Sequence, residues 1–150
     1  MTVRTSATTT LKISAGVPAT FDSTGYGALS YTQVGEITNF GDLGREYQLT
    51  THNPVDKRST VKLKGSFNEG SLDLQLGLDI ADAGQILCKA AALSDSPYAF
   101  KITTADAHIY YFQGVVMGWK VGVKGVNDVT SATAKVEITS SATGVGIVEV

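Results

Sequence analysis

The side chains that could bind a metal or act in catalysis are few and widely separated in this sequence. The two histidines, His52 and His108, have no glutamate or second histidine at the spacing of a zinc site. Asp79 and Asp82 lie close together, but no third carboxylate completes a calcium-binding loop. We therefore predict no metal site, no bound cofactor and no catalytic residue.

The glycine and cysteine patterns also argue against an enzyme. Neither Gly25-Tyr26-Gly27 nor Gly144-Val145-Gly146 is followed by the third glycine and the helix of a dinucleotide site. Serine and threonine are plentiful, but none lies in a nucleophile-elbow pattern. The single cysteine, Cys88, cannot form an internal disulfide and has apolar neighbours, which predicts a buried structural thiol.

Composition limits the class of protein. A chain of 150 residues that is 43% hydrophobic is predicted to form a single domain, residues 1–150, with a real core. Its formal charge of -2 does not favour binding to duplex DNA, which requires a basic surface, although a pore that DNA crosses without binding stays possible. No run approaches the ~18 apolar residues of a membrane span, so we expect a cytosolic product with no membrane partner.

The segment 71–93 contains two periodicities. Leucines at every second position alternate with polar residues and predict a strand over 71–79. Asp82 and Gln85 then resemble a capping box, in which Asp82 accepts from the first-turn N–H groups and Gln85 reaches back to the cap. We expect a helix over about residues 82–93 whose core-facing stripe is Ala83, Ile86, Leu87, Ala90 and Leu93.

Strand patterns dominate the remaining sequence. Alternation and turn residues predict strands over 31–40, 45–51, 59–64, 98–102, 109–123 and 133–139. Residues 1–10 are expected to form an N-terminal arm or edge strand, 14–30 a loop and 140–150 a C-terminal tail. The predicted fold class is mainly β, a β-sandwich or barrel with one flanking α-helix.

The predicted hairpin over 45–64 differs in composition from the rest of the chain. It carries five cations (Arg45, Lys57, Arg58, Lys62 and Lys64) and two acids (Glu46 and Asp56), so its charge is +3. It has few large apolar residues, and an isolated ribbon of this kind is barely stable. Two interpretations stay open: a solvated hairpin whose lysines protect a sheet edge, or a projecting arm whose charges set its register on an acidic surface of another copy.

The order of several short segments carries a resemblance to a known family. These segments are Val34-Gly35-Glu36-Ile37, Gly44-Arg45-Glu46, Thr50-Thr51-His52-Asn53, Lys64-Gly65, 79–85 (DIADAGQ), Tyr98-Ala99-Phe100-Lys101-Ile102 and Phe112-Gln113-Gly114-Val115-Val116. In this order they resemble the major tail tube proteins of long-tailed phages with flexible, non-contractile (siphovirus-type) tails. The strand that runs into the Asp-Ala-Gly-Gln helix is the most specific part.

The resemblance implies a structural role in a virion tail. Members of the family form hexameric rings whose inner sheets join into a barrel around a lumen, and the rings stack into a tube that conducts DNA at infection. The implied partners are other copies of the chain, the tail tip or baseplate, the tape measure protein and the tail terminator. The protein would be made in the host cytoplasm, and DNA would pass through the lumen without specific binding.

Within such a ring, the alternating strands predict which side chains face the channel. The strands over 71–79 and 133–139 each have one apolar face, so the opposite face must point to water. The predicted lumen residues are Asp73, Gln75, Lys135 and Glu137, together with Lys120 and Lys124 by the same alternation.

Two other functions remain open at this stage. A tube protein of the type VI secretion machinery has a related ring architecture and would carry effectors instead of DNA. A carbohydrate-binding or adhesion β-sandwich would need exposed aromatic side chains, which Tyr98, Tyr110, Tyr111 and Trp119 could supply.

Overall fold

The computed structural model describes residues 3–150 and is mainly β, with ten strands and two helices in this part of the chain. The main sheet contains β1 (Thr10–Ser14), β2 (Thr32–Val34), β3 (Ile37–Asn39), β6 (Ser71–Gly77), β7 (Tyr98–Thr103), β8 (Ile109–Gly122), β9 (Ser131–Thr139) and β10 (Val148–Glu149). A separate two-stranded sheet contains β4 (Glu46–His52) and β5 (Val61–Asn68). The helices are α1 (Ser23–Gly27) and α2 (Ala83–Ala92). The first two residues of the predicted N-terminal arm lie outside the described residues.

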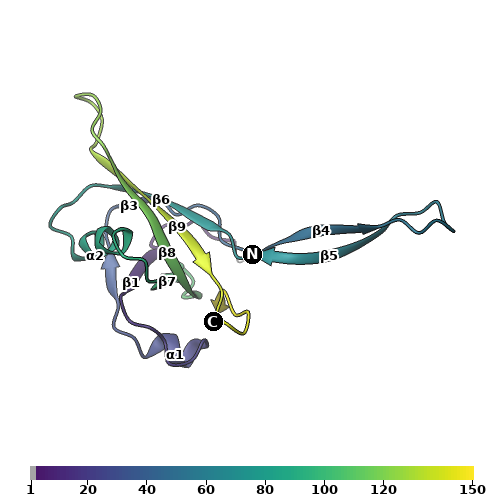
Figure 1. The fold of residues 1–150 in the computed structure, drawn as a ribbon. Helices are drawn as coiled ribbons and strands as arrows, with labels where there is room; N and C mark the ends of the chain where they lie inside the picture. The colour runs from purple at the N-terminus through teal and green to yellow at the C-terminus, as the bar shows by residue number, and fades with distance from the viewer. Residues whose placement is uncertain (1–2) are drawn as a thin grey trace.

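The main sheet is antiparallel and strongly curled. Its strand order is β2-β1-β7-β8-β9-β6-β3, so the consecutive strands β2 and β3 lie at its two opposite ends. Only Gly35 and Glu36 separate them, and the sheet must therefore curl until its ends are close together (Figure 1). The long strand β8 pairs with β7 and β10 through its first half and with β9 through its second half. The prediction of a sandwich or barrel with a flanking helix is confirmed.

The prediction of one strand over 31–40 is wrong, because the chain turns sharply at its centre. Glu36 adopts a positive φ of 62°, which lies outside the range of regular strand conformation. The two halves consequently pair with different partners, β2 with β1 and β3 with β6. Residues 3–9 of the expected N-terminal arm form neither a strand nor a helix, and Thr10 begins β1, an interior strand between β2 and β7.

The core lies inside the curled sheet, beneath α2. The alternation predicted for β6 and β9 is confirmed: Leu72, Leu74 and Leu76 are buried, as are the alternate residues of β9 from Ala132 to Ile138. Phe100 and Phe112 stack at the centre with ring centroids 5.3 Å apart. A smaller cluster forms where Tyr26 of α1 stacks on Tyr111 of β8. Helix α1 lies within the segment 14–30, for which the sequence predicts a loop.

Helix α2 forms where the sequence predicts it, but with a different face inward. Its buried residues are Gly84, Gln85, Cys88 and Ala91. Leu87 of the predicted stripe packs against the core, whereas Ile86 and Leu93 are 55% and 86% exposed. The reason is close packing, because a Cβ on Gly84 would lie 2.1 Å from the carbonyl oxygen of Gln33. Small residues permit this approach and large ones do not. The expected burial of Cys88 is confirmed, and burial raises the pKa of its thiol to about 12.

Strands β4 and β5 form a hairpin that projects from the body of the molecule, on the side away from α2 (Figure 1). Every residue of both strands is exposed. The hairpin was predicted over 45–64, and it extends four residues further, to Asn68. We call residues 45–68 the arm. Neither helix in the described part of the chain has the length and apolar character needed to cross a membrane.

Candidate functional site

The described residues contain no group of three metal-binding side chains. His52 is exposed on the arm, and His108 is half-exposed, with its Nε2 2.7 Å from Oε1 of Glu149. Of the four aromatic residues considered for carbohydrate binding, Tyr111 is buried and Tyr98, Tyr110 and Trp119 are partly buried. Three surfaces of the molecule stand out.

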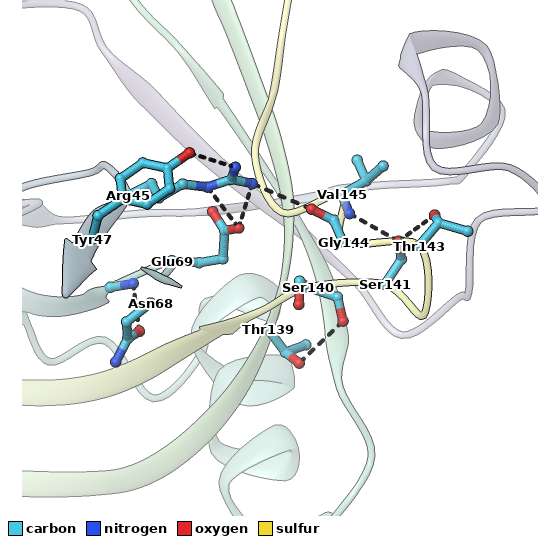
Figure 2. A network of polar contacts seen from close by, with 11 residues as sticks. Arg45, Tyr47, Asn68, Glu69, Thr139, Ser140, Ser141, Thr143, Gly144 and Val145 are labelled. Atoms are coloured by element: carbon cyan, nitrogen blue, oxygen red, sulfur yellow. Dashed lines mark hydrogen bonds and ion pairs between the residues drawn. The ribbon is translucent and has the colours of Figure 1, made fainter. Parts of the chain in front are cut away.

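The first surface is the arm, whose base is fixed to the body by a buried carboxylate (Figure 2). Arg45 donates from Nε and Nη2 to Oε1 of Glu69, at 3.0 and 2.6 Å, and from Nη2 to the carbonyl oxygen of Gly144 at 3.2 Å. Its guanidinium also lies over the Phe67 ring, 3.8 Å from the centroid. The hydrogen bonds that Arg45 donates to Glu69 and, to a lesser extent, to Tyr47 raise the pKa of Arg45, which keeps the guanidinium charged.

Arg45 thus binds within its own chain, whereas the other charged residues predicted for contacts between copies lie along the arm. Lys57 and Arg58 lie exposed in the turn at its tip, and Lys62 and Glu46 are exposed on its strands. Lys64 lies with its Nζ 4.7 Å from the Tyr47 ring centroid. Sequence reasoning missed Glu69, which is only 5% exposed, because its partner Arg45 lies 24 residues away.

The second surface is an exposed polar face on the second half of β8 and on β9 and β6. Cross-strand pairing places Asp73 opposite Lys135, and Thr133 between Gln75 and Lys120. Glu137 lies two residues along β9 from Lys135, with their charged atoms 3.6 Å apart. The structure therefore brings together five of the six predicted lumen residues: Asp73, Gln75, Lys120, Lys135 and Glu137. Lys124 lies apart from them, in the loop after β8 ends at Gly122.

The third surface begins at the junction where α2 meets both ends of the sheet. Asp82 caps the helix as predicted, because its carboxylate accepts from the N–H of Gln85 at 3.0 Å. It also accepts from the N–H of Gly35 at 3.1 Å, between β2 and β3. The predicted return bond from Gln85 to the cap is wrong: the Asp82 N–H already bonds the carbonyl of Asp79, and Gln85 accepts from the N–H of Asp79 instead.

Gln85 makes two further bonds that sequence reasoning missed. Its Nε2 donates to the carbonyl of Gly77 at 2.9 Å, where β6 ends, and to the carbonyl of Gly35 at 3.1 Å. One buried side chain thus joins α2 to the segments that follow β2 and β6.

An apolar groove lies next to this junction, between α2 and the end of β8, and we call it the α2 groove. It is lined by Leu78, Asp79, Ile80, Ile86, Trp119 and Val121, among others.

Comparison with known proteins gives structural neighbours only. No family model matches the sequence, and no curated protein is significantly similar to it. The fold is similar to a chain in the 6-fold symmetrised cryo-EM structure of the anti-feeding prophage baseplate. The TM-score is 0.69 and the identity 13%, and the match covers 93% of this chain and 94% of that one.

A second similar chain comes from the PVC sheath/tube terminator of an extracellular contractile injection system in its extended state. The TM-score is 0.70 and the identity 7%, over 100% of this chain and 98% of the other. At these identities the likeness shows the fold. That fold is shared with one chain of a prophage baseplate and one chain of a contractile injection system, whereas the sequence resemblance is to non-contractile tail tubes.

Proposed function

We propose that this chain is a structural, non-enzymatic protein of a phage tail or a related injection particle, in which copies form sixfold rings that stack into a tube. The observation that carries the proposal is the extent of the structural match. It spans 100% of this chain and 98% of a chain from a sheath/tube terminator, with a TM-score of 0.70. The other structural neighbour comes from the 6-fold symmetrised baseplate of the anti-feeding prophage.

The sheet edges give a physical reason for ring formation. An exposed edge strand presents unpaired N–H and C=O groups that can pair with another chain. Strands β2 and β3 are the end strands of the main sheet, so one edge of each has no partner strand in the described part of the chain. Repeated head-to-tail contacts between such subunits either close into a ring or continue as a filament. A stack of rings would also cover the arm, whose two strands are exposed along their whole length.

The position of the ring within the particle has two candidates. The sequence resemblance favours the repeating subunit of a tube, and it implies contacts with the tape measure protein, the tail tip or baseplate and the terminator. The structural neighbours favour a ring at the end of a tube, in a terminator or a baseplate. Negative-stain images of the purified protein separate the two candidates, because the first forms long tubes and the second forms discrete rings. A strictly monomeric protein at high concentration in light scattering would refute both.

In this proposal the polar face lines the channel through which DNA passes. The face carries Asp73 and Glu137 beside Lys120 and Lys135, so neither sign dominates. A lysine-rich wall would bind DNA, because each phosphate that a cation neutralises adds affinity through counterion release. A wall of mixed charge avoids this strong binding and lets the DNA move.

Labelling of a cysteine on the polar face tests the channel. Asp73→Cys is expected to react quickly with a bulky maleimide in the free chain and much more slowly in assembled tubes. Ala19→Cys, in the exposed loop before α1, serves as the outer-surface control and should react quickly in both states. The native Cys88 contributes little, since it is buried and its pKa is raised to about 12. Equal rates for the two variants in tubes would place the polar face outside the channel.

Charge reversal at the tip of the arm tests its role in assembly. Lys57→Glu with Arg58→Glu is expected to stop tube growth and leave the fold intact, because both side chains are exposed in a turn. Each exposed ion pair is worth only ~0.2–1 kcal/mol, but every ring loses several of them. Lys120→Glu with Lys124→Glu makes the same charge change away from the arm and should still assemble. Normal polymerisation of the arm variant, by sedimentation and electron microscopy, would remove the tip from the assembly contacts.

A further inference from the structure

The arm joins the body through two glycines that lie close together. Gly44 precedes the first residue of the arm, and Gly70 lies between β5 and β6 with a positive φ of 90°. A Cβ on Gly70 would lie 2.8 Å from the carbonyl oxygen of Gly44, so both strands leave the body at one point. Glycine restricts the backbone less than any other residue, and a joint made of two glycines does not by itself hold the arm at one angle.

The length of the arm makes its direction important for any contact near its tip. The seven residues of β4 span about 20 Å at ~3.4 Å per residue, so a rotation of roughly 15° at the base moves the far end by about 5 Å. Both strands are exposed along their whole length. In the described part of the chain, the contacts that can oppose such a rotation are therefore those at the base of the arm.

An ion pair closes the base of the arm (Figure 2). Arg45 lies just before β4 and Glu69 just after β5, so their hydrogen bonds of 3.0 and 2.6 Å tie the two ends of the arm together. The Glu69 side chain is only 4% exposed. Water and salt therefore screen this ion pair less than a pair on the surface, and it can hold the joint in place.

The C-terminal segment connects this ion pair to the main sheet. The carbonyl oxygen of Gly144 accepts from Nη2 of Arg45 at 3.2 Å. Gly146 is buried against the carboxylate, and a Cβ on it would lie 2.5 Å from Oε1 of Glu69. Hydrogen bonds between Ser141 and Val145 close the turn that carries Gly144, and β10 then pairs with β8. The direction of the arm is thus linked to the sheet through the C-terminal segment.

We propose that Glu69, Gly144 and Gly146 form a seat for Arg45 that positions the arm. The seat holds the arm at one angle in the free chain, so its tip reaches a neighbouring copy at one place. A preorganised arm loses less conformational freedom on binding than a swinging one. The inference rests on the proposed function, in which the arm is an assembly contact, but the seat lies within one chain. Its members and Arg45 are positioning residues, which act on assembly through the arm.

The distance between two spin labels tests the seat in the free chain. His52→Cys carries one label at the far end of β4, and Gln75→Cys carries the other on β6 of the main sheet. Both positions are exposed, and the native Cys88 is buried. We expect double electron–electron resonance to give one narrow distance. A broad distribution in this labelled chain would overturn the proposal, because the arm would then have no fixed direction.

Gly146→Ala changes the seat and leaves the arm itself unchanged. The added methyl group displaces the Glu69 carboxylate and Arg45 with it, so we expect the distance to shift or spread by about 5 Å, as for the rotation above. Arg45→Lys keeps the charge but loses the planar fork that reaches Oε1 and Gly144 together, and it should also broaden the distribution. Gly118→Ala adds a methyl group away from the seat, with no heavy atom within 4 Å of its Cβ, and should keep the narrow distance.

A purely structural role of the seat would lower the stability of these variants and leave the distance unchanged. If Gly146→Ala and Arg45→Lys, both folded by circular dichroism, keep the narrow distance, the seat does not position the arm. Because the distances come from the free chain, a chain that never assembles would refute the proposed function and leave this result standing. Normal tube growth by unlabelled Gly146→Ala, with its arm displaced, would overturn the link between arm direction and assembly.

Discussion

Gln85→Glu is expected to destabilise the protein severely although the two side chains have nearly the same shape. Gln85 is 2% exposed, and its Nε2 donates to the carbonyls of Gly35 and Gly77. A carboxylate has no hydrogen to donate, so two partly buried carbonyls lose this partner and face a negative charge. A fully buried unsatisfied group costs ~1–3 kcal/mol, so two partly buried ones set a loss of up to about 2–6 kcal/mol against a typical total of ~5–15 kcal/mol.

The loss of stability in Gln85→Glu should depend on pH, and the burial of the new carboxyl group determines the direction of that dependence. A carboxyl group buried beside two carbonyl oxygens has its pKa raised above the value in the unfolded chain, ~4.3. The folded state then holds more protons than the unfolded state between the two pKa values, so stability falls as pH rises through that interval. We expect the free energy of unfolding of Gln85→Glu, from urea titrations, to approach that of the unsubstituted protein as pH falls from 7 toward 4.

Gln85→Met is the control for charge, because it removes both Nε2 hydrogen bonds, keeps a similar volume and adds no charge; it also removes the acceptor of the Asp79 N–H, which glutamate would keep. Its deficit in free energy of unfolding should be smaller at pH 7 and should not change with pH. If Gln85→Glu unfolds at the same urea concentration as the unsubstituted protein, the junction at Gly35 and Gly77 does not hold the sheet ends as the structure indicates.

The parts of the fold that sequence reasoning predicted correctly are those with a strong local pattern. Alternating leucines in β6 and alternating small apolar residues in β9 define which face is buried, since the side chains of a strand point to opposite faces in turn. The same alternation predicted that Asp73, Gln75, Lys135 and Glu137 share an exposed face. The arm was predicted because a charged ribbon with few apolar residues differs from a core hairpin.

The parts that were missed depend on contacts between distant residues. The split between β2 and β3 arises from the positive φ of Glu36, which the side chain gives no reason to expect. The ion pair of Arg45 with Glu69 and the bonds of Gln85 to Gly35 join positions 24 and 50 residues apart. The inward face of α2 was missed because the helix has apolar residues on two faces, and the large side chains of Ile86 and Leu93 point outward while Leu87 packs against the core.

We expect that close packing at Gly84 decides which face of α2 points inward. Gly84→Ala adds one methyl group, which would lie 2.1 Å from the carbonyl oxygen of Gln33 and 2.6 Å from the Cα of Val34. Both are backbone atoms of β2, so the helix must move away from the sheet. Overpacking of this kind costs ~1–3 kcal/mol, although alanine favours a helix by ~1 kcal/mol over glycine. We expect a clear net loss in the free energy of unfolding.

Gly118→Ala is the matched control for this substitution. Gly118 lies at the bulge of β8, and a Cβ there would have no heavy atom within 4 Å. Alanine at this position should leave stability unchanged or raise it by ~0.4–1 kcal/mol, since it restricts the unfolded chain. The helix movement also displaces Gln85 from the carbonyls of Gly35 and Gly77, so amide exchange should rise at Asp79, whose N–H bonds Gln85. Equal stability of the two alanine variants would mean that close contact with β2 does not determine the inward face of α2.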